Sequence, residues 1–206
     1  MNEAIVLPDG SRIEATPGKY RVVPPPDLNE VEGGRFLLEY EFPFLIVRGM
    51  STRSASDEEQ GAASLQARLW VLQHPRINAK VGGCRLGYQF NAPRRRQGRC
   101  YHRQFIPDIS YVEKNMGYLP CVPAVVIELM SATDRMEDLQ AKVTKFINAG
   151  TREGVVVDTR GDRVWIYNRN EQPYFDSLAE IQFDSWPDFT LDCIAIRDAR
   201  TRLRLR

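Results

Sequence analysis

The 206-residue sequence has little of what metal-stapled, disulfide-bonded or membrane-spanning proteins contain. Its four cysteines, Cys84, Cys100, Cys121 and Cys193, show no C-x-x-C spacing, and it has only two histidines, which argues against a structural zinc site. No apolar stretch is long enough to span a bilayer, and no charged stub followed by an apolar core opens the sequence. We therefore expect a cytoplasmic protein with free thiols and no membrane partner.

Neither sign of charge is in excess. The chain has 28 Lys and Arg against 27 Asp and Glu, a formal net charge of +1, so its overall field cannot attract nucleic acid. Hydrophobic residues (43%) and charged residues (27%) are at levels typical of a soluble globular protein. The length suffices to bury a core without disulfides, and we expect one domain over 1–206 with a β-rich N-terminal portion over 1–50.

Two acidic residues occur in strand-like runs. Asp108 lies in the run 105–112, and Glu128 lies in the strongly apolar run 124–130. A carboxylate among such apolar residues costs several kcal/mol to keep ionised unless a partner meets it. A divalent metal shared by both acids is one such partner, because Mg2+ prefers oxygen ligands. An arginine, or a solvated strand face, is the alternative.

The segment after Glu128 predicts a helix. Asp134 and Glu137 form a capping pattern at its start, and Gly150 suits its C-terminal end. Lys142 lies at the border of the apolar stripe, where it can lean over the sheet or extend its ammonium to water, while Lys145 points away. The stripe consists of Met136, Leu139, Val143, Phe146 and Ile147.

Several motifs follow one another in a characteristic order. They are Ile106-Pro107-Asp108, Val126 to Ser131, Asp134-Arg135, Asp138-Leu139, Lys142, Phe146, Ala149-Gly150, Val157-Asp158 and Val164 to Tyr167. In this order they resemble the Uma-two family (Uma2) of restriction-endonuclease-like proteins, within the PD-(D/E)XK nuclease superfamily. The resemblance covers about Gln104 to Tyr167, with a weaker echo over 186–192.

This resemblance implies an α+β fold (α/β-like): a restriction-endonuclease-like mixed central β-sheet, flanked by helices, with extra N-terminal strands. Two helices bracket the expected sheet, and the acidic pair lies near its middle. The expected strands are 4–7 and 12–15, which form a hairpin, then 35–42, 44–47, 77–81, 86–90, the two acid-bearing runs, 154–158 and 164–167.

The resemblance also implies a metal-dependent endonuclease that hydrolyses phosphodiester bonds of nucleic acid, with DNA as the first choice. Asp108 and Glu128 would be catalytic and would bind Mg2+ or Mn2+ together with the backbone carbonyl of Leu129. In the superfamily a lysine commonly lies two residues beyond the glutamate, where this sequence has Met130. Lys142 would then be the migrated equivalent, which orients the attacking water or stabilises developing charge.

The N-terminal half fits the family less well, because members carry a histidine near the start of their first long helix and this chain has none there. Ser56 and Glu59 predict a capping box for a helix that runs to about His74. Either Glu58 or Glu59 is a third acidic ligand, or both are solvated acids that favour the helix dipole. The expected packing stripe of this helix consists of Ala62, Leu65, Leu69 and Leu72.

Basic residues gather in two places. A loop just before Asp108 is the candidate nucleic-acid-binding segment, unless it is simply a solvated loop. The C-terminal tract 197–206 predicts an edge strand or a frayed tail. The candidate nucleic-acid ligands in the loop are Arg94, Arg95, Arg96, Arg99 and Arg103.

Three functions stay open at this point. The first is the endonuclease; the second is a catalytically inactive nuclease-fold protein that acts as a nucleic-acid-binding or scaffold module, which Met130 favours; the third is an enzyme acting on another phosphate ester. A homodimer is compatible with the first, since nucleases that cut both strands often dimerise. Ser131 either supports the metal ligands by hydrogen bonding or caps the helix that follows.

Overall fold

The computed structural model describes residues 4–24, 26, 28, 31, 36–41, 43–49, 55–77, 79–83, 88–91, 102–105, 107–113, 122–132 and 134–202. The chain divides into two compact units. Unit 1 comprises Met1–Thr52 and Gly87–Ile106, and unit 2 comprises Arg53–Leu86 and Pro107–Arg206. Each unit has its own hydrophobic core among the described residues, and the two are described separately.

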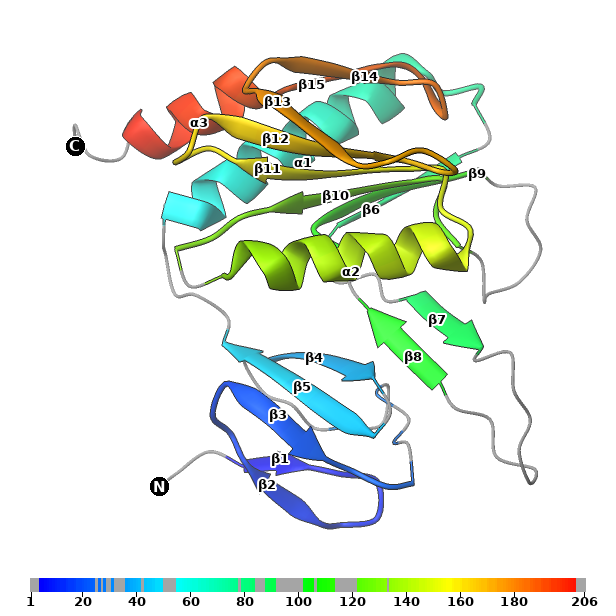
Figure 1. Cartoon of the computed structure of the whole chain (residues 1–206), viewed down its shortest axis with the longest axis vertical. Coiled ribbons are helices and arrows are strands. Elements are labelled where there is room, and N and C mark those ends of the chain that lie inside the picture. Colours follow the sequence, from blue (N-terminus) through cyan, green and yellow to red (C-terminus); the bar gives the residue numbers. More distant parts are fainter. Residues whose placement is uncertain are drawn as a thin grey trace. The chain divides into compact units, whose positions relative to one another are not determined.

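Unit 1 is built from antiparallel strands (Figure 1). The expected hairpin forms because Asp9 accepts hydrogen bonds from Ser11 and Gly10 takes a positive φ of 81° in the turn. A five-stranded sheet follows, in the order β3-β5-β4-β8-β7. The strands are β1 (Ala4–Val6), β2 (Arg12–Glu14), β3 (Gly18–Arg21), β4 (Phe36–Glu41), β5 (Phe44–Gly49), β7 (Tyr88–Asn91) and β8 (His102–Phe105).

Unit 2 contains a six-stranded sheet in the order β13-β12-β11-β10-β9-β6. Only the β10–β11 pair is parallel among these described strands, and the other neighbours are antiparallel, so the sheet is mixed as expected. The strands are β6 (Ala79–Gly83), β9 (Ile109–Glu113), β10 (Val125–Leu129), β11 (Glu153–Asp158), β12 (Arg163–Asn168) and β13 (Tyr174–Ser177). A separate hairpin joins β14 (Glu180–Phe183) to β15 (Trp186–Asp192).

The described part of unit 2 also contains three helices. Figure 1 shows α2 (Met136–Ala149) along one face, with α1 (Ala55–Gln73) and α3 (Cys193–Arg202) on the other. Because side chains alternate along a strand, β10 sends Ile127 and Leu129 into the core on the α1 side and turns Glu128 toward α2. The mixed α+β fold predicted from the sequence is thus confirmed. No helix in the described ranges is long and apolar enough to cross a membrane.

The predicted packing stripe of α1 is confirmed at Ala62, which packs against the core, and is wrong for its three leucines. Leu65, Leu69 and Leu72 are exposed, whereas Ala63, Ala67 and Trp70 are buried. The helix contacts α3, and the Trp70 indole Nε1 donates a hydrogen bond to the Pro187 carbonyl of β15 at 2.9 Å. The buried face of α1 therefore carries two alanines and a tryptophan rather than the row of leucines.

The expected start of α2 and the expected conformation of the C-terminal tract also need correction. Neither Asp134 nor Ser131 caps α2: the helix begins at Met136, and Arg135 occupies the N-cap position without a side-chain bond. Its C-terminal end is confirmed, since Gly150 takes a φ of 124°. The C-terminal basic tract is helical up to Arg202 rather than a strand, and its remaining residues lie outside the described part. The Asp192 carboxylate accepts from the Ala195 N–H at 2.8 Å, which starts α3.

Candidate active site

Glu128 lies near the C-terminal end of β10, on the face that α2 covers, and only 2% of its surface is exposed. The Lys142 ammonium meets this buried carboxylate, with Nζ at 3.0 Å from Oε1 and 3.1 Å from Oε2. Lys142 itself is 5% exposed, so both charges have lost nearly all contact with water. Such a pair is held in place strongly, because separating the charges would leave each one buried without its counter-ion.

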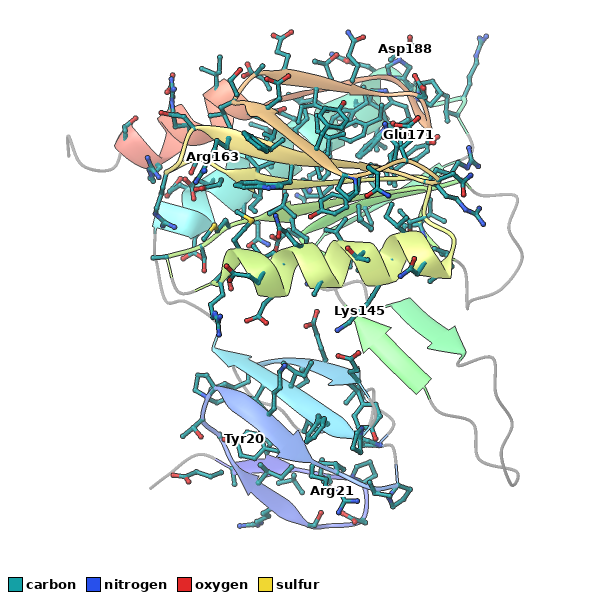
Figure 2. The ribbon with its side chains drawn as sticks, viewed as in Figure 1. Tyr20, Arg21, Lys145, Arg163, Glu171 and Asp188 are labelled. Atoms are coloured by element: carbon teal, nitrogen blue, oxygen red, sulfur yellow. The ribbon has the colours of Figure 1, made fainter. Side chains whose placement is uncertain are left out.

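Lys142 reaches Glu128 because α2 lies directly over β10 and β11. Lys142 belongs to the buried side of the helix together with Leu139, Val143 and Phe146. Lys145, by contrast, is only half-buried, and Figure 2 shows it on the side of α2 that faces away from the sheet. The structure therefore places Lys142, and not Lys145, at Glu128.

Asp108 immediately precedes β9, the antiparallel neighbour of β10. The register pairs Ile109 with Ile127, so one further step brings Asp108 beside Glu128. The Leu129 backbone N–H donates to Asp108 Oδ2 at 2.7 Å, and the Gln60 side-chain amide of α1 donates to Oδ1 at 2.9 Å. Asp108 and Glu128 thus lie on neighbouring strands near one end of the central sheet, with Lys142 paired to Glu128.

These residue types fit a divalent cation by ligand chemistry and by charge. Two carboxylates and one ammonium leave a net charge of −1, and the two acids offer oxygen ligands, which Mg2+ and Mn2+ prefer. Among the described residues, no three His, Cys, Asp or Glu side chains gather closely enough to form a fuller site. Mg2+ does not require one, since it is commonly held by one or two carboxylates and completes its shell with water and substrate phosphate.

The two further acids considered as metal ligands, Glu58 and Glu59, lie near the start of α1 in different surroundings. Glu58 is exposed, whereas Glu59 is 1% exposed and hydrogen-bonded to the Thr159 hydroxyl. The Arg200 guanidinium of α3 lies 3.6 Å from Glu59 Oε1 and also donates to Thr159 at 3.2 Å. A ligand role for either glutamate stays a prediction.

Ser131 follows β10 in a short loop. Its backbone N–H donates to Asp134 Oδ2 at 2.9 Å, so Asp134 orders the loop between strand and helix. A supporting role for the Ser131 hydroxyl behind the acids stays a prediction. Arg94, Arg95, Arg96 and Arg99 lie outside the described residues; Arg103 belongs to β8, but its side chain is not described.

Two contacts at this end of the sheet were not predicted. Gln60 had no signal of its own beside Glu58 and Glu59, although it is the residue of α1 that bonds to Asp108. Arg160 follows β11, and its guanidinium Nη1 lies 3.4 Å from the Met130 carbonyl oxygen. Their positions depend on how the helix crosses the sheet and on the parallel pairing of β10 with β11, which local sequence patterns do not specify.

The mixed sheet and its helices define the class of the protein as nuclease-like in fold. A crystal structure of "a putative nuclease belonging to DUF820" from Anabaena variabilis matches with a TM-score of 0.59 over 79% of this chain and 90% of that one. At 15% sequence identity this likeness shows a shared fold. The family model Uma2, described as "Putative restriction endonuclease", matches residues 47–193, so the chain belongs to the Uma2 family. No curated protein matches the chain.

Proposed function

We propose that the protein is a metal-dependent endonuclease that hydrolyses phosphodiester bonds in nucleic acid, with DNA as the expected substrate. The observation that carries this proposal is the buried ion pair of Glu128 with Lys142, one register step along the sheet from Asp108. Membership of the Uma2 family supports it. Hydrolysis forms a bond from water oxygen to phosphorus and breaks one ester bond, which leaves a terminal phosphate and a hydroxyl.

Asp108 and Glu128 would hold Mg2+ or Mn2+, with the Leu129 carbonyl as a further ligand. When bound, this cation would supply Lewis-acid stabilisation of the phosphate charge and lower the pKa of water. The Leu129 N–H and the Gln60 amide hold both oxygens of Asp108, which orients that carboxylate before any ligand arrives.

Lys142 has a role of its own in this proposal. An ammonium only donates hydrogen bonds, so Lys142 would orient water, or stabilise a phosphate oxygen, by donating to it rather than by taking a proton. Lys142 belongs to a helix and pairs with Glu128 of the strand. The usual lysine position on that strand is occupied by Met130. The Lys142 side chain therefore reaches Glu128 from the α2 face of the sheet and would serve as an equivalent of the missing strand lysine.

Cleavage of supercoiled plasmid DNA in Mg2+ or Mn2+ tests the proposal. Asp108→Asn and Glu128→Gln keep the side-chain shapes and remove one charge each, so both should lower cleavage by at least about a hundredfold. Glu180→Gln removes an exposed charge from β14 and serves as the matched control. Titration calorimetry with Mg2+ should show binding by the parent and the control, and loss of binding in the two site variants.

A catalytically inactive nucleic-acid-binding or scaffold module is the second candidate. Met130 favours it, because no strand lysine is present and Lys142 is committed to an ion pair with Glu128. In that case the parent protein would bind nucleic acid without cutting any DNA or RNA form, and calorimetry would detect no Mg2+ uptake. Cleavage that Asp108→Asn and Glu128→Gln both abolish would eliminate this candidate.

A further inference from the structure

The turn after β11 lies at the same end of the sheet as the candidate active site. β10 and β11 run parallel, with Leu129 paired to Val157, and the Met130 N–H continues the ladder to the Val157 carbonyl at 2.9 Å. Residues that follow both strands therefore emerge side by side. The turn that begins at Asp158 is thus a structural neighbour of Glu128, although the two acids are far apart in the sequence.

Asp158 holds this turn in one conformation. Its Oδ1 accepts from the backbone N–H groups of Arg160 at 3.1 Å and Gly161 at 2.9 Å. A Cβ on Gly161 would lie only 2.3 Å from Asp158 Oδ2, so the turn has no room for a side chain there. Asp158 is itself 7% exposed. The backbone that carries the Arg160 side chain is therefore fixed relative to the sheet.

Arg160 differs from the other described arginines around this end of unit 2. Arg163 lies 3.8 Å from the Asp158 carboxylate, Arg197 lies 3.2 Å from that of Asp162, and Arg200 lies 3.6 Å from that of Glu59. Arg160 is exposed and donates to a backbone carbonyl, that of Met130, and within the described ranges it forms no ion pair with a carboxylate. Among the described residues its positive charge is therefore not offset by an acid, and it lies at the carbonyl of Met130, two residues beyond Glu128.

We propose that Arg160 binds a backbone phosphate of the nucleic acid at the candidate metal site. A guanidinium presents five donors in a planar fork that matches phosphate oxygens, and at this site it would add positive charge where Met130 adds none. This contact would be to a phosphate and not to a base, so it would position the substrate without sequence preference. This inference rests on the proposed function, and it identifies one residue through which the substrate is held.

Binding of a short fluorescein-labelled DNA duplex in EDTA, measured by fluorescence anisotropy across a salt series, tests the inference without cleavage. Arg160→Ala should weaken binding by about tenfold and reduce the salt slope by about one. Arg160→Lys should fall between this variant and the parent, since it keeps the charge and loses the fork. Arg169→Ala, which removes an exposed arginine beyond the opposite end of β12, should bind as the parent does.

The possible results are separable. If Arg160→Ala matches the parent in affinity and slope, or if Arg169→Ala is weakened equally, Arg160 is an ordinary surface residue and the inference fails. The proposed endonuclease then still stands on the plasmid assay. If the parent binds no DNA or RNA in EDTA or in Ca2+, the proposed function fails and this inference fails with it. Unchanged melting temperatures in all three variants show that the comparison reports binding.

Discussion

Glu128 and Lys142 form an ion pair with almost no access to water, and this pair should determine the stability of unit 2 as well as its chemistry. We expect Lys142→Met to lower the free energy of unfolding by about 3 kcal/mol, because the substitution leaves the Glu128 charge buried without its cation. Urea unfolding at neutral pH measures this change. Combining it with Glu128→Gln should recover much of the loss, since the buried charge is then removed as well.

Lys145→Met is the matched control, because it removes an ammonium from the same helix on the side facing away from the sheet (Figure 2). A change below about 1 kcal/mol is expected there. Equal destabilisation by the two lysine variants would show that the ion pair with Glu128 contributes nothing specific to stability.

One buried cysteine and two buried tyrosines, which become charged when they lose a proton, should lower the stability of the folded state at alkaline pH. Burial, with the nearby Asp192 charge, raises the pKa of Cys193 from 9.0 to about 12, and burial raises the pKa values of Tyr40 and Tyr167 from 10.0 to about 12. The folded state thus keeps all three neutral after they would ionise in the unfolded chain. Their contribution to stability is full below the unfolded pKa values and is lost as pH rises from about 9 toward 12.

Urea unfolding at several pH values checks this expectation. Wherever the pH lies between the unfolded and the folded pKa of one of these groups, that group should lower the free energy of unfolding by about 1.4 kcal/mol per pH unit. A Tyr167→Phe variant should lose stability less steeply above about pH 10, since it removes one of these groups. A free energy that stays level up to the highest pH tested would contradict the assignment of these groups as buried and neutral.

At the scale of the elements, Gly154 sets the distance between α2 and the sheet. A Cβ at this position would lie 2.6 Å from a methyl of Val143 and 3.1 Å from a methyl of Val126. Gly154→Ala should destabilise the protein by about 1–3 kcal/mol, because β-branched side chains in a packed core cannot move aside easily. It should also lower cleavage, since the same helix carries Lys142. Adding Val143→Ala should restore part of both.

A second glycine gives the opposite expectation and serves as the control. Gly61 is exposed within α1, and a Cβ there would meet no atom within 4 Å. Gly61→Ala should therefore stabilise the protein by about 0.5–1 kcal/mol through helix propensity alone. If both alanine variants change the urea midpoint in the same direction, the close approach at Gly154 does not limit packing.

The elements show which sequence signals carry structural information. The stripe of α2 and its terminal Gly150 predicted that helix well, because one strongly apolar face has a single surface to cover. On α1 the leucines and the alanines form competing stripes, and the choice between them depends on packing against α3 and the strands, which are distant in the sequence. α3 itself was missed, because its apolar residues are few and its arginines gave an alternating pattern that also fits a strand.

The candidate site, too, could be predicted only in part. Asp108, Glu128 and Lys142 came from the resemblance and from the physical cost of a carboxylate in an apolar strand. Gln60 and Arg160 could not be found this way, because their proximity depends on the helix crossing and on parallel pairing between β10 and β11. Long-range pairing is set by the packing of the whole sheet, which leaves no local sequence signal.

At the scale of the whole molecule, the two compact units and the predicted single domain over 1–206 lead to different expectations for a shortened chain. Among the described residues, the core of unit 2 contains residues from Ala63 to Ile196 and none from unit 1, and the core of unit 1 lies within its first 47 residues. Gly83 of β6 pairs with Ile109 of β9, so the ends of the segment that leaves unit 2 lie side by side. Neighbouring antiparallel strands can be joined by a short turn.

We therefore expect residues 53–86, joined by a short Gly-Ser linker to residues 107–206, to fold as an independent protein. It would retain Asp108, Glu128, Lys142 and Arg160, so Mg2+ binding by calorimetry should persist at parent affinity. Its DNA binding should show a smaller salt slope than the parent, because the predicted phosphate contacts of the 94–103 arginines are missing. An unfolded or aggregated product would instead establish that the chain folds only as one cooperative domain.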